Sequence, residues 1–289
     1  MGSQLDHRPD ARPMKRVSPW SRLSLAAGLV AGSAGPMASP APPTPGTVEH
    51  LKDFPVIELR RYTIKAGERQ NFADYFESFF PEAFEQIGAI AFGQFLERKN
   101  SSRFTWIRGF HTLADRAALN GAFYDGPLWK EHRATMNGIL DDSDDVLLLR
   151  PLDSGSAIPV LPAVDPVRPP RGAPGVVAAQ IFAVKPGAVD AFAREIRGTL
   201  AAYRRAGARE AGVLVTLDVP NNFPRLPIRT DGPFLVWLGI FEDDRALERA
   251  LPIAERSAVE LSGTDLLRNA PEWVVLEPTR RSRLRWMAP

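Results

Sequence analysis

The chain has 289 residues, 44% of them hydrophobic, a composition typical of a globular protein with room for two ordinary domains. It contains no cysteine, which excludes disulfides, thiolate nucleophiles and cysteine-based metal sites. Its four histidines have no ligand-like spacing. The sequence therefore predicts neither a metal site nor a bound cofactor.

The net charge of +2 conceals an uneven distribution along the chain. Residues 1–22 contribute +3, and four arginines within residues 280–285 contribute +4. Subtracting these charges from +2 leaves the body of the chain at about −5. A body of this charge lacks the positive field that nucleic-acid binding needs, so we expect no nucleic-acid partner.

Residues 1–54 have the composition of a disordered leader, rich in Pro, Ser, Ala and Gly. Within them the basic stretch Met14–Arg16 precedes a short apolar run, Leu23–Gly32, and then small residues. This pattern resembles a secretory signal and predicts an exported, periplasmic protein; a cytoplasmic protein with an Ala-rich leader is the alternative. The run is shorter than the roughly 20 residues that span a bilayer, so we expect no stable membrane insertion.

Residues 55–151 show the order β-α-β-β-α-β of a ferredoxin-like unit. The expected strands are 56–63, 90–97, 104–110 and 146–150, and the expected helices are 68–86, 113–124 and 129–140. Pro81 falls inside the first helical pattern and should interrupt it. We interpret the acidic run Asp141–Asp145 as a solvated turn, because it lacks the central Gly and closing Glu of a calcium loop.

The same pattern returns after a proline-rich linker, residues 152–174. Val176–Gly187 matches Val56–Gly67 at an offset of 120, whereas Trp237 matches Trp106 at an offset of 131. The second unit, residues 175–279, therefore carries 11 extra residues within 219–232, and a basic tail, residues 280–289, follows it. The sequence predicts a tandem duplication. Its expected fold is α+β, with two antiparallel sheets packed as a pseudo-dimeric α/β barrel around a cavity.

Strand periodicity predicts which side chains face this cavity. We expect Ile57 and Leu59 to pack against the helices, so the cavity receives a polar and aromatic set of side chains. This set is Glu58, Arg60 and Tyr62 from the first strand, with Trp106 and Arg108 from the third. The second unit replaces it with Ala178, Gln180, Phe182, Trp237 and Gly239. Because isolated buried charges are costly, the Glu and Arg side chains either bind a polar ligand or form an ion-pair network that only holds the sheet.

The run Tyr124–Arg133 concentrates aromatic and ionisable side chains. Trp129, His132, Arg133 and Met136 share one face at helical spacing. We therefore add Tyr124, Trp129 and Arg133 to Arg60, Tyr62, Trp106 and Arg108 as candidate ligand-binding residues. Glu58 and His132 are the candidate bases for proton abstraction, with arginine stabilising a developing enolate. A structural or surface histidine is the alternative interpretation of His132.

The insertion at 219–232 places Phe223, Leu226 and Ile228 among three prolines. Such apolar side chains are costly to leave in water, so we expect the insertion to pack on the barrel mouth or on a neighbouring subunit. Arg225 and Arg229 would then be available to an anionic group. The alternative is a hairpin extension that only plugs the barrel end.

Four stretches together resemble the NIPSNAP family: Val56–Tyr62 with Lys65–Gly67, Phe104–Phe110, Gly126–Arg133 and Asp144–Pro151. The resemblance implies a bacterial-type member with the dimeric α/β-barrel domain in tandem, and homodimers as a further expectation. The wider superfamily includes cofactor-independent monooxygenases, isomerases and haem proteins, so the fold leaves the question of an enzyme open. We expect a small aromatic or acidic metabolite bound in the barrel; the alternative is a non-catalytic scaffold or protein-interaction module.

Overall fold

The computed structural model of the protein describes residues 53–288. The signal-like pattern in the leader lies outside the described residues. The described residues belong to one compact unit, which contains both predicted ferredoxin-like units. Among them, no helix combines the length and the apolar character needed to cross a membrane.

The first half of the barrel follows the expected order of elements. Its elements are β1 (Val56–Ile64), α1 (Arg69–Phe79), α2 (Pro81–Gln86), β2 (Ile90–Glu97), β3 (Arg103–Phe110), α3 (Leu113–Tyr124), α4 (Pro127–Ile139) and β4 (Leu140–Pro151). The predicted interruption at Pro81 is confirmed, because Pro81 ends one helical segment and begins α2, where its missing N–H costs nothing. Thr112 caps α3 by accepting a hydrogen bond from the backbone N–H of Asp115.

The second half repeats this order with fewer helices. Its elements are β5 (Val176–Ala183), α5 (Val189–Glu195), α6 (Arg197–Arg205), β6 (Arg209–Thr216), β7 (Phe234–Phe241), α7 (Asp244–Ser262) and β8 (Glu272–Pro278). The turn after the first strand of each half contains a glycine with positive φ, Gly67 at 83° and Gly187 at 77°. Only glycine adopts this conformation without strain, which explains why both turns carry one.

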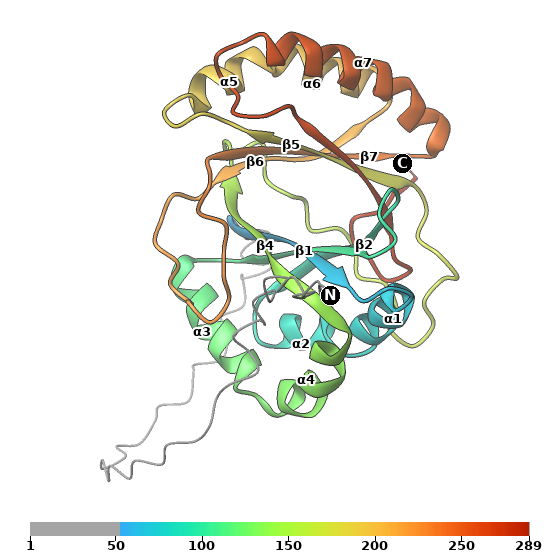
Figure 1. The fold of residues 1–289 in the computed structure, drawn as a ribbon. Coiled ribbons are helices and arrows are strands. Elements are labelled where there is room, and N and C mark those ends of the chain that lie inside the picture. Colours follow the sequence, from blue (N-terminus) through green and yellow to red (C-terminus); the bar gives the residue numbers. More distant parts are fainter. Residues whose placement is uncertain (1–52, 289) are drawn as a thin grey trace, which may run out of the picture. The chain divides into compact units, whose positions relative to one another are not determined.

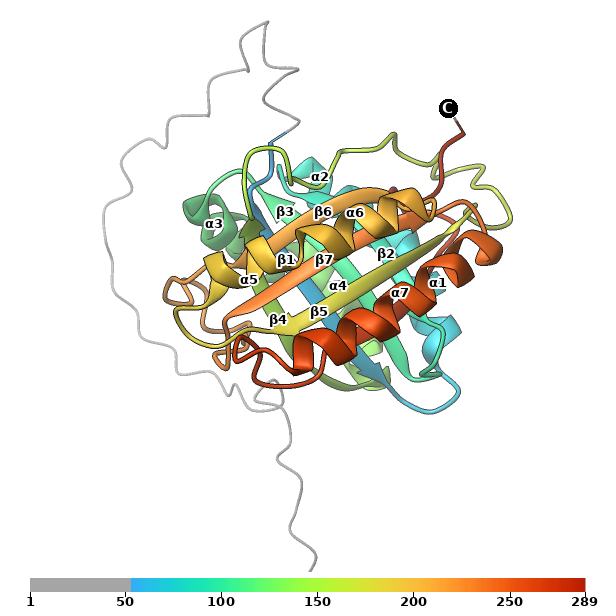
Figure 2. The ribbon, with the colours of Figure 1, turned by 90° about the horizontal axis from the view of Figure 1, so that it is seen from above.

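The eight strands close into an antiparallel barrel in the order β1-β3-β2-β8-β5-β7-β6-β4. Two short seams join the four-stranded sheets of the two halves: β2 pairs with β8, and β4 pairs with β6. Helices α1–α4 cover the outside of the first sheet and α5–α7 cover the second (Figure 1). Viewed from above, α6 and α7 run along the strands of the second sheet (Figure 2). The predicted pseudo-dimeric α/β barrel is confirmed.

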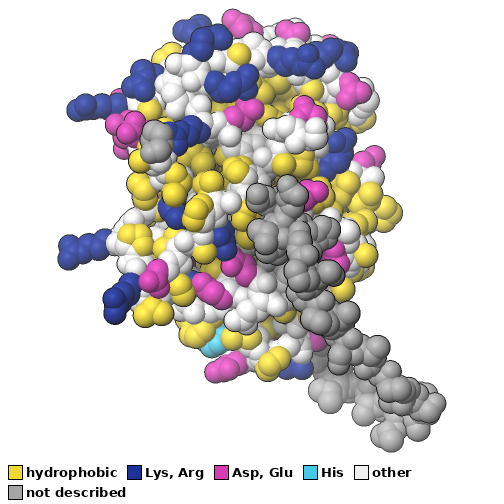
Figure 3. Space-filling view, turned by 180° about the vertical axis from the view of Figure 1, so that it is seen from behind, with side chains coloured by type: hydrophobic (Ala, Val, Ile, Leu, Met, Phe, Trp, Pro, Cys, Tyr) yellow, Lys and Arg dark blue, Asp and Glu magenta, His cyan; other side chains and the backbone are white. Residues whose placement is uncertain are grey.

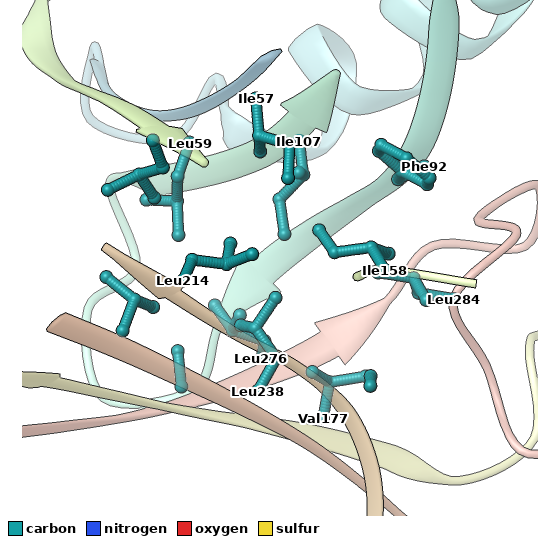
Figure 4. Packing of buried hydrophobic residues seen from close by; sticks show 14 of the residues in the cluster. Ile57, Leu59, Phe92, Ile107, Ile158, Val177, Leu214, Leu238, Leu276 and Leu284 are labelled. Carbon is teal, nitrogen blue, oxygen red and sulfur yellow. The ribbon is translucent and has the colours of Figure 1, made fainter. Parts of the chain in front are cut away.

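The interior of the barrel is filled by apolar side chains from both halves, most of them aliphatic (Figure 4). Ile57, Leu59 and Ile107 of the first half pack there against Leu238 and Leu276 of the second half. The prediction that Ile57 and Leu59 pack against the helices is therefore wrong. The predicted cavity set of Glu58, Arg60, Tyr62, Trp106 and Arg108 lies instead on the outer face of the sheet, under α1–α3.

The reason for this reversal is that β1 is buried on both faces, so polarity alone does not reveal which face is inside. Packed sheets generally lie about 10 Å apart, a spacing that interdigitating apolar side chains fill. In the middle of such a core a guanidinium group would find no partner. Arg61, on the inward side of β1, lies at the end of the barrel, where Glu97 and Glu272 reach it. On the helical side, by contrast, other polar side chains can reach guanidinium groups.

The acidic run 141–145 is part of β4, so its interpretation as a turn is wrong. β4 pairs with β1 through register shifts near Thr63, and Asp142 lies opposite Thr63. Most of the acidic side chains are exposed, while Asp145 lies within 3.7 Å of Arg61 and 3.2 Å of Arg229. Solvent and these arginines compensate the charges, and the backbone remains free to pair as a strand.

Two segments outside the strands add to the core. Ile158 of the linker packs in the barrel cluster, and the Val213 N–H donates to the Ser156 carbonyl at 3.0 Å. The basic tail is also packed: Leu284 is fully buried in the barrel core, and Arg283 pairs with Glu85 of α2 at 2.7 Å. On the rear face of the molecule, acidic and basic side chains are interspersed (Figure 3).

Candidate functional site

A cluster of one carboxylate and three guanidinium groups lies between the first sheet and its helices. Glu58 and Arg108 are directly opposite each other on β1 and β3, and Arg60 is two residues further along β1 on the same face. Glu58 Oε2 accepts from Arg60 Nη1 at 2.8 Å and from Arg108 Nε at 2.8 Å. Glu58 Oε1 accepts from Arg116 Nε of α3 at 2.6 Å. We call these four residues the arginine cluster.

The arginine cluster is buried and carries an excess of positive charge. Its four side chains are at most 1% exposed. Three arginines against one glutamate leave a charge of +2. Burial alone would raise the pKa of the Glu58 carboxyl, but the charges of Arg108, Arg60 and Arg116 outweigh it and hold that pKa well below its ordinary 4.5. Burial lowers the pKa of Arg116, and the repulsion from Arg108 and Arg60 lowers it further.

Several polar atoms around the cluster have no hydrogen-bond partner among the described residues. They are Arg108 Nη1, Arg116 Nη2, Trp106 Nε1 and both amide atoms of Asn120. Asn120 lies one helical turn after Arg116 on the buried face of α3, and the Arg108 guanidinium lies 5.0 Å from the Trp106 ring. Four of these atoms are donors and one, Asn120 Oδ1, is an acceptor. Buried polar atoms are normally satisfied, so this excess of free donors suits an acceptor-rich ligand.

Aromatic rings surround the guanidinium groups. The Arg108 guanidinium also lies 5.2 Å from the Phe84 ring, and Arg60 Nε donates to the Tyr62 hydroxyl at 2.8 Å. Tyr124 is buried, and burial raises the pKa of its hydroxyl despite the opposing effect of Arg108. Arg60, Tyr62, Trp106, Arg108 and Tyr124, all candidates from the sequence, are thus brought together, although beneath the helices rather than inside the barrel.

The remaining candidates lie elsewhere on α4. His132 is buried, its Nδ1 shares a hydrogen bond with the Tyr75 hydroxyl at 2.7 Å, and its ring stacks on Phe79 at 4.0 Å. Ring contacts lead from His132 through Phe80 and Phe123 to Phe84, which lies beside Arg108; among the described residues no direct contact joins His132 to Glu58. Trp129 is partly buried and touches Tyr124, whereas Arg133 is exposed. Of the four residues expected on one face of α4, Trp129, His132 and Met136 therefore face inward, whereas Arg133 does not.

The insertion of the second half contributes two acceptors for Arg116. Arg116 Nη1 donates to Asn222 Oδ1 at 2.7 Å and to Asn221 Oδ1 at 3.0 Å. Sequence reasoning missed Arg116, Asn120, Asn221 and Asn222. The spacing of Arg116 and Asn120, which places two polar side chains on one face of an otherwise Ala- and Leu-rich helix, was the available signal. No local pattern connects either of them to the insertion about a hundred residues later.

The corresponding place in the second half is closed by aromatic rings. Gly239 takes the position of Arg108, and the Trp237 ring lies where a side chain at Gly239 would be, 2.2 Å from an added Cβ. Tyr203 packs on Trp237 at 4.6 Å and donates to Gln180 Oε1 at 2.7 Å, so the polar group that replaces Arg60 has its own partner. The cluster is therefore a property of the first half alone.

A second buried arginine provides a contrast at one end of the barrel interior. Arg61 Nε pairs with Glu97 at 2.7 Å and Arg61 Nη2 pairs with Glu272 at 2.8 Å, while Asp145 lies 3.7 Å from Nη1. Burial opposes the charged form of Arg61, but Glu97 and Glu272 outweigh it and raise the pKa of the guanidinium. This cluster has more carboxylates than its central arginine needs, the reverse of the arginine cluster.

Fold and site together define an eight-stranded α/β barrel, formed by one chain, with a polar cluster beneath the helices of its first half. No protein-family model matches the chain, and a sequence search of curated proteins finds no match. Among solved structures, a monooxygenase candidate from Fusobacterium nucleatum subsp. nucleatum is similar over 81% of this chain and 97% of its own, with a TM-score of 0.53 and 10% identity. This similarity shows the fold.

Two NIPSNAP proteins are also among the similar structures, as the sequence resemblance predicted. An uncharacterised NIPSNAP domain protein from Burkholderia xenovorans has 18% identity and a TM-score of 0.32; the match covers 34% of this chain and 96% of that one. A NIPSNAP family protein from Agrobacterium tumefaciens has 21% identity and a TM-score of 0.32, over 34% of this chain and 94% of its own.

Proposed function

We propose that the first half of the barrel binds a small organic anion between its sheet and helices α1–α3. The observation that carries this proposal is the buried arginine cluster, with a charge of +2 and free donors on Arg108 and Arg116. Buried charge of one sign is costly, and an anion would both neutralise it and accept from the free donors. Because the uncompensated charge of the arginine cluster costs free energy, we infer that a bound anion compensates it.

The surroundings of the cluster favour a planar, partly aromatic anion. Trp106 and Phe84 present ring surfaces beside the Arg108 guanidinium, and Tyr124 lies close enough to Arg108 and Arg60 for their charges to act on its hydroxyl. The Trp106 N–H and the Asn120 amide add neutral hydrogen-bonding groups. Ring faces hold a flat ligand, while guanidinium forks match the two oxygens of a carboxylate. An aromatic carboxylate or an enolate-type acid meets both requirements.

The cluster is suited to stabilising negative charge rather than to removing a proton. Glu58 is held in its ionised form by three arginines, which makes it a poor base; we assign it a positioning role for Arg60, Arg108 and Arg116. In the described part of the chain, His132 makes no direct contact with Glu58. Any chemistry at this site would therefore act on an anion that the arginines stabilise, and oxygenation of such an anion agrees with the name of the Fusobacterium neighbour.

The competing function is a scaffold in which the arginine cluster only holds the sheet to its helices. The closed contacts of Glu58, whose two oxygens accept from all three arginines, favour this alternative. It predicts that no anion stabilises the protein and that loss of Arg108 changes stability alone.

A thermal-shift and calorimetric screen separates the two functions. Aromatic carboxylates, each tested against its neutral primary amide, should raise the melting temperature of the wild type, and the amides should not. In Arg108→Met, affinity for the carboxylate should fall by about 10- to 100-fold, as expected for a lost charged hydrogen bond. Arg108→Lys, which keeps the charge without the fork, should lose less.

The matched control is Arg61→Met, which removes a buried arginine from the carboxylate-rich cluster. It should lower stability while leaving the affinity for the carboxylate unchanged. If no carboxylate stabilises the wild type, or if Arg61→Met weakens binding as much as Arg108→Met does, the anion site is refuted.

A further inference from the structure

The insertion between β6 and β7 is fixed at its two ends. The Leu217 N–H donates to the Leu148 carbonyl at 2.9 Å and the Arg229 N–H donates to the Val146 carbonyl at 2.8 Å, so both ends are attached to β4 by the backbone. Within the insertion, Leu226 is buried and the Leu226 N–H donates to the Phe223 carbonyl at 3.0 Å. The insertion is therefore a compact loop rather than a loose one.

The tip of the insertion, residues 220–227, lies over the first half and is held there through side chains. Besides the bonds from Arg116 to Asn221 and Asn222, the Asn222 amide donates to the Leu113 carbonyl of α3, and the Phe223 ring lies 6.3 Å from the Tyr124 ring. Arg225 pairs with Asp125 at 2.8 Å, and both of these side chains are exposed. Exposed ion pairs and single ring contacts are weak, in contrast to the backbone bonds at the ends of the insertion.

We propose that this tip is a gate over the arginine cluster, which moves as a unit about its attached ends and exchanges the Asn221 and Asn222 amide oxygens for an anion on Arg116. The proposal rests on the proposed function and adds how the ligand reaches its site. Prolines at 220, 224 and 227 stiffen the tip, so it moves as one piece.

Three observations support the gate. The cluster is fully enclosed, so an organic ligand needs an opening. The groups that cover Arg116 are neutral amide oxygens, which a carboxylate outcompetes for a guanidinium because charged acceptors bind more strongly. A cavity of about 630 Å³ lies beside the tip, with Asn221, Ile228 and Leu148 in its wall, and offers room for a ligand next to the gate.

Access to the cluster can be measured without knowing the ligand, because the chain has no cysteine. Asn120→Cys places the only thiol on the buried face of α3 beside the cluster. Its reaction rate with methanethiosulfonate reagents reports how often the site opens. The gate is loosened by the double substitution Phe223→Ala and Arg225→Ala, which removes the ring contact and the exposed ion pair.

The loosened gate should increase the thiol reaction rate by about tenfold, because two weak interactions no longer hold the tip closed. An anionic reagent should react about tenfold faster than a cationic reagent of similar size, because the arginines attract it. The matched control is Arg98→Ala, which removes exposed ion pairs to Asp244 and Glu277 away from the tip and should leave the thiol rate unchanged.

Unchanged thiol rates in the loosened gate would overturn the proposal, and so would an equal increase in the Arg98→Ala control. The carboxylate identified in the screen provides a second readout on the natural background: its association and dissociation rates should both increase in the double variant. Failure of the proposed function appears differently, as an absence of carboxylate binding with the thiol rates still dependent on the gate.

Discussion

Replacing Glu58 with Gln should be among the most destabilising single changes in the chain. The substitution removes the only negative charge from the arginine cluster and with it three ion pairs of 2.6–2.8 Å, and leaves three guanidinium groups enclosed together. Breaking a buried pair by removing one partner costs about 3–5 kcal/mol, because the other charge stays buried. We expect a loss of this size in the free energy of unfolding at pH 7, measured by urea denaturation.

The effect of Glu58→Gln on the free energy of unfolding should also depend on pH. Since the folded-state pKa of Glu58 lies below the ordinary 4.5, its contribution to stability is fully present above that pH and is lost as the pH falls towards the folded-state value. Glu58→Gln lacks this contribution. The difference in unfolding free energy between wild type and variant should therefore be constant from pH 7 to about 5.5 and shrink below pH 4.5.

Two comparison variants test the charge argument itself. Glu97→Gln makes the same chemical change next to Arg61, which keeps Glu272 and Asp145, so the loss should be only about 1–2 kcal/mol. Arg108→Met lowers the charge of the arginine cluster from +2 to +1 and should also cost less than Glu58→Gln. If either variant is as destabilised as Glu58→Gln, an excess of buried positive charge is the wrong description of the site.

The remaining predictions concern packing. Leu284→Ala empties a fully buried position of the barrel core and should cost about 2–5 kcal/mol in urea denaturation, whereas Val259→Ala on the exposed side of α7 should change stability by less than about 0.5 kcal/mol. If the tail only rested on the surface, Leu284→Ala and Val259→Ala would change the free energy of unfolding equally little. Gly239→Ala pushes a methyl group into the Trp237 ring and should cost about 1–3 kcal/mol, while Gly121→Ala, with open space in α3, should stabilise by about 0.5–1 kcal/mol. Melting curves that rank the two glycine variants the other way would refute this packing.

The two halves of the barrel contribute different residues to the arginine cluster and its surroundings. The first half supplies the arginine cluster, and the second half fills the equivalent space with Trp237 and Tyr203. The second half contributes instead through segments that reach across, namely the insertion over Arg116 and the tail on α2. A barrel built from two identical halves would have no such asymmetry.

The sequence by itself determined the order of elements, because local patterns carry that information. Alternation in β1, aromatic spacing in α1, the stop at Pro81 and the glycine after each first strand each depend on neighbouring residues only. Two units of this kind have unpartnered sheet faces, so the closed barrel also followed from the sequence.

Only the tertiary structure decided which face of the first sheet is the interior and what completes the site. Because β1 is buried on both faces, the polarity of Glu58 and Arg60 did not indicate a direction, and the need to pack two sheets closely placed the aliphatic side inward. The partners of Arg116 come from β1 and from the insertion, 58 and more than a hundred residues away in the chain. Contacts at such separations leave no local pattern, and they define the site.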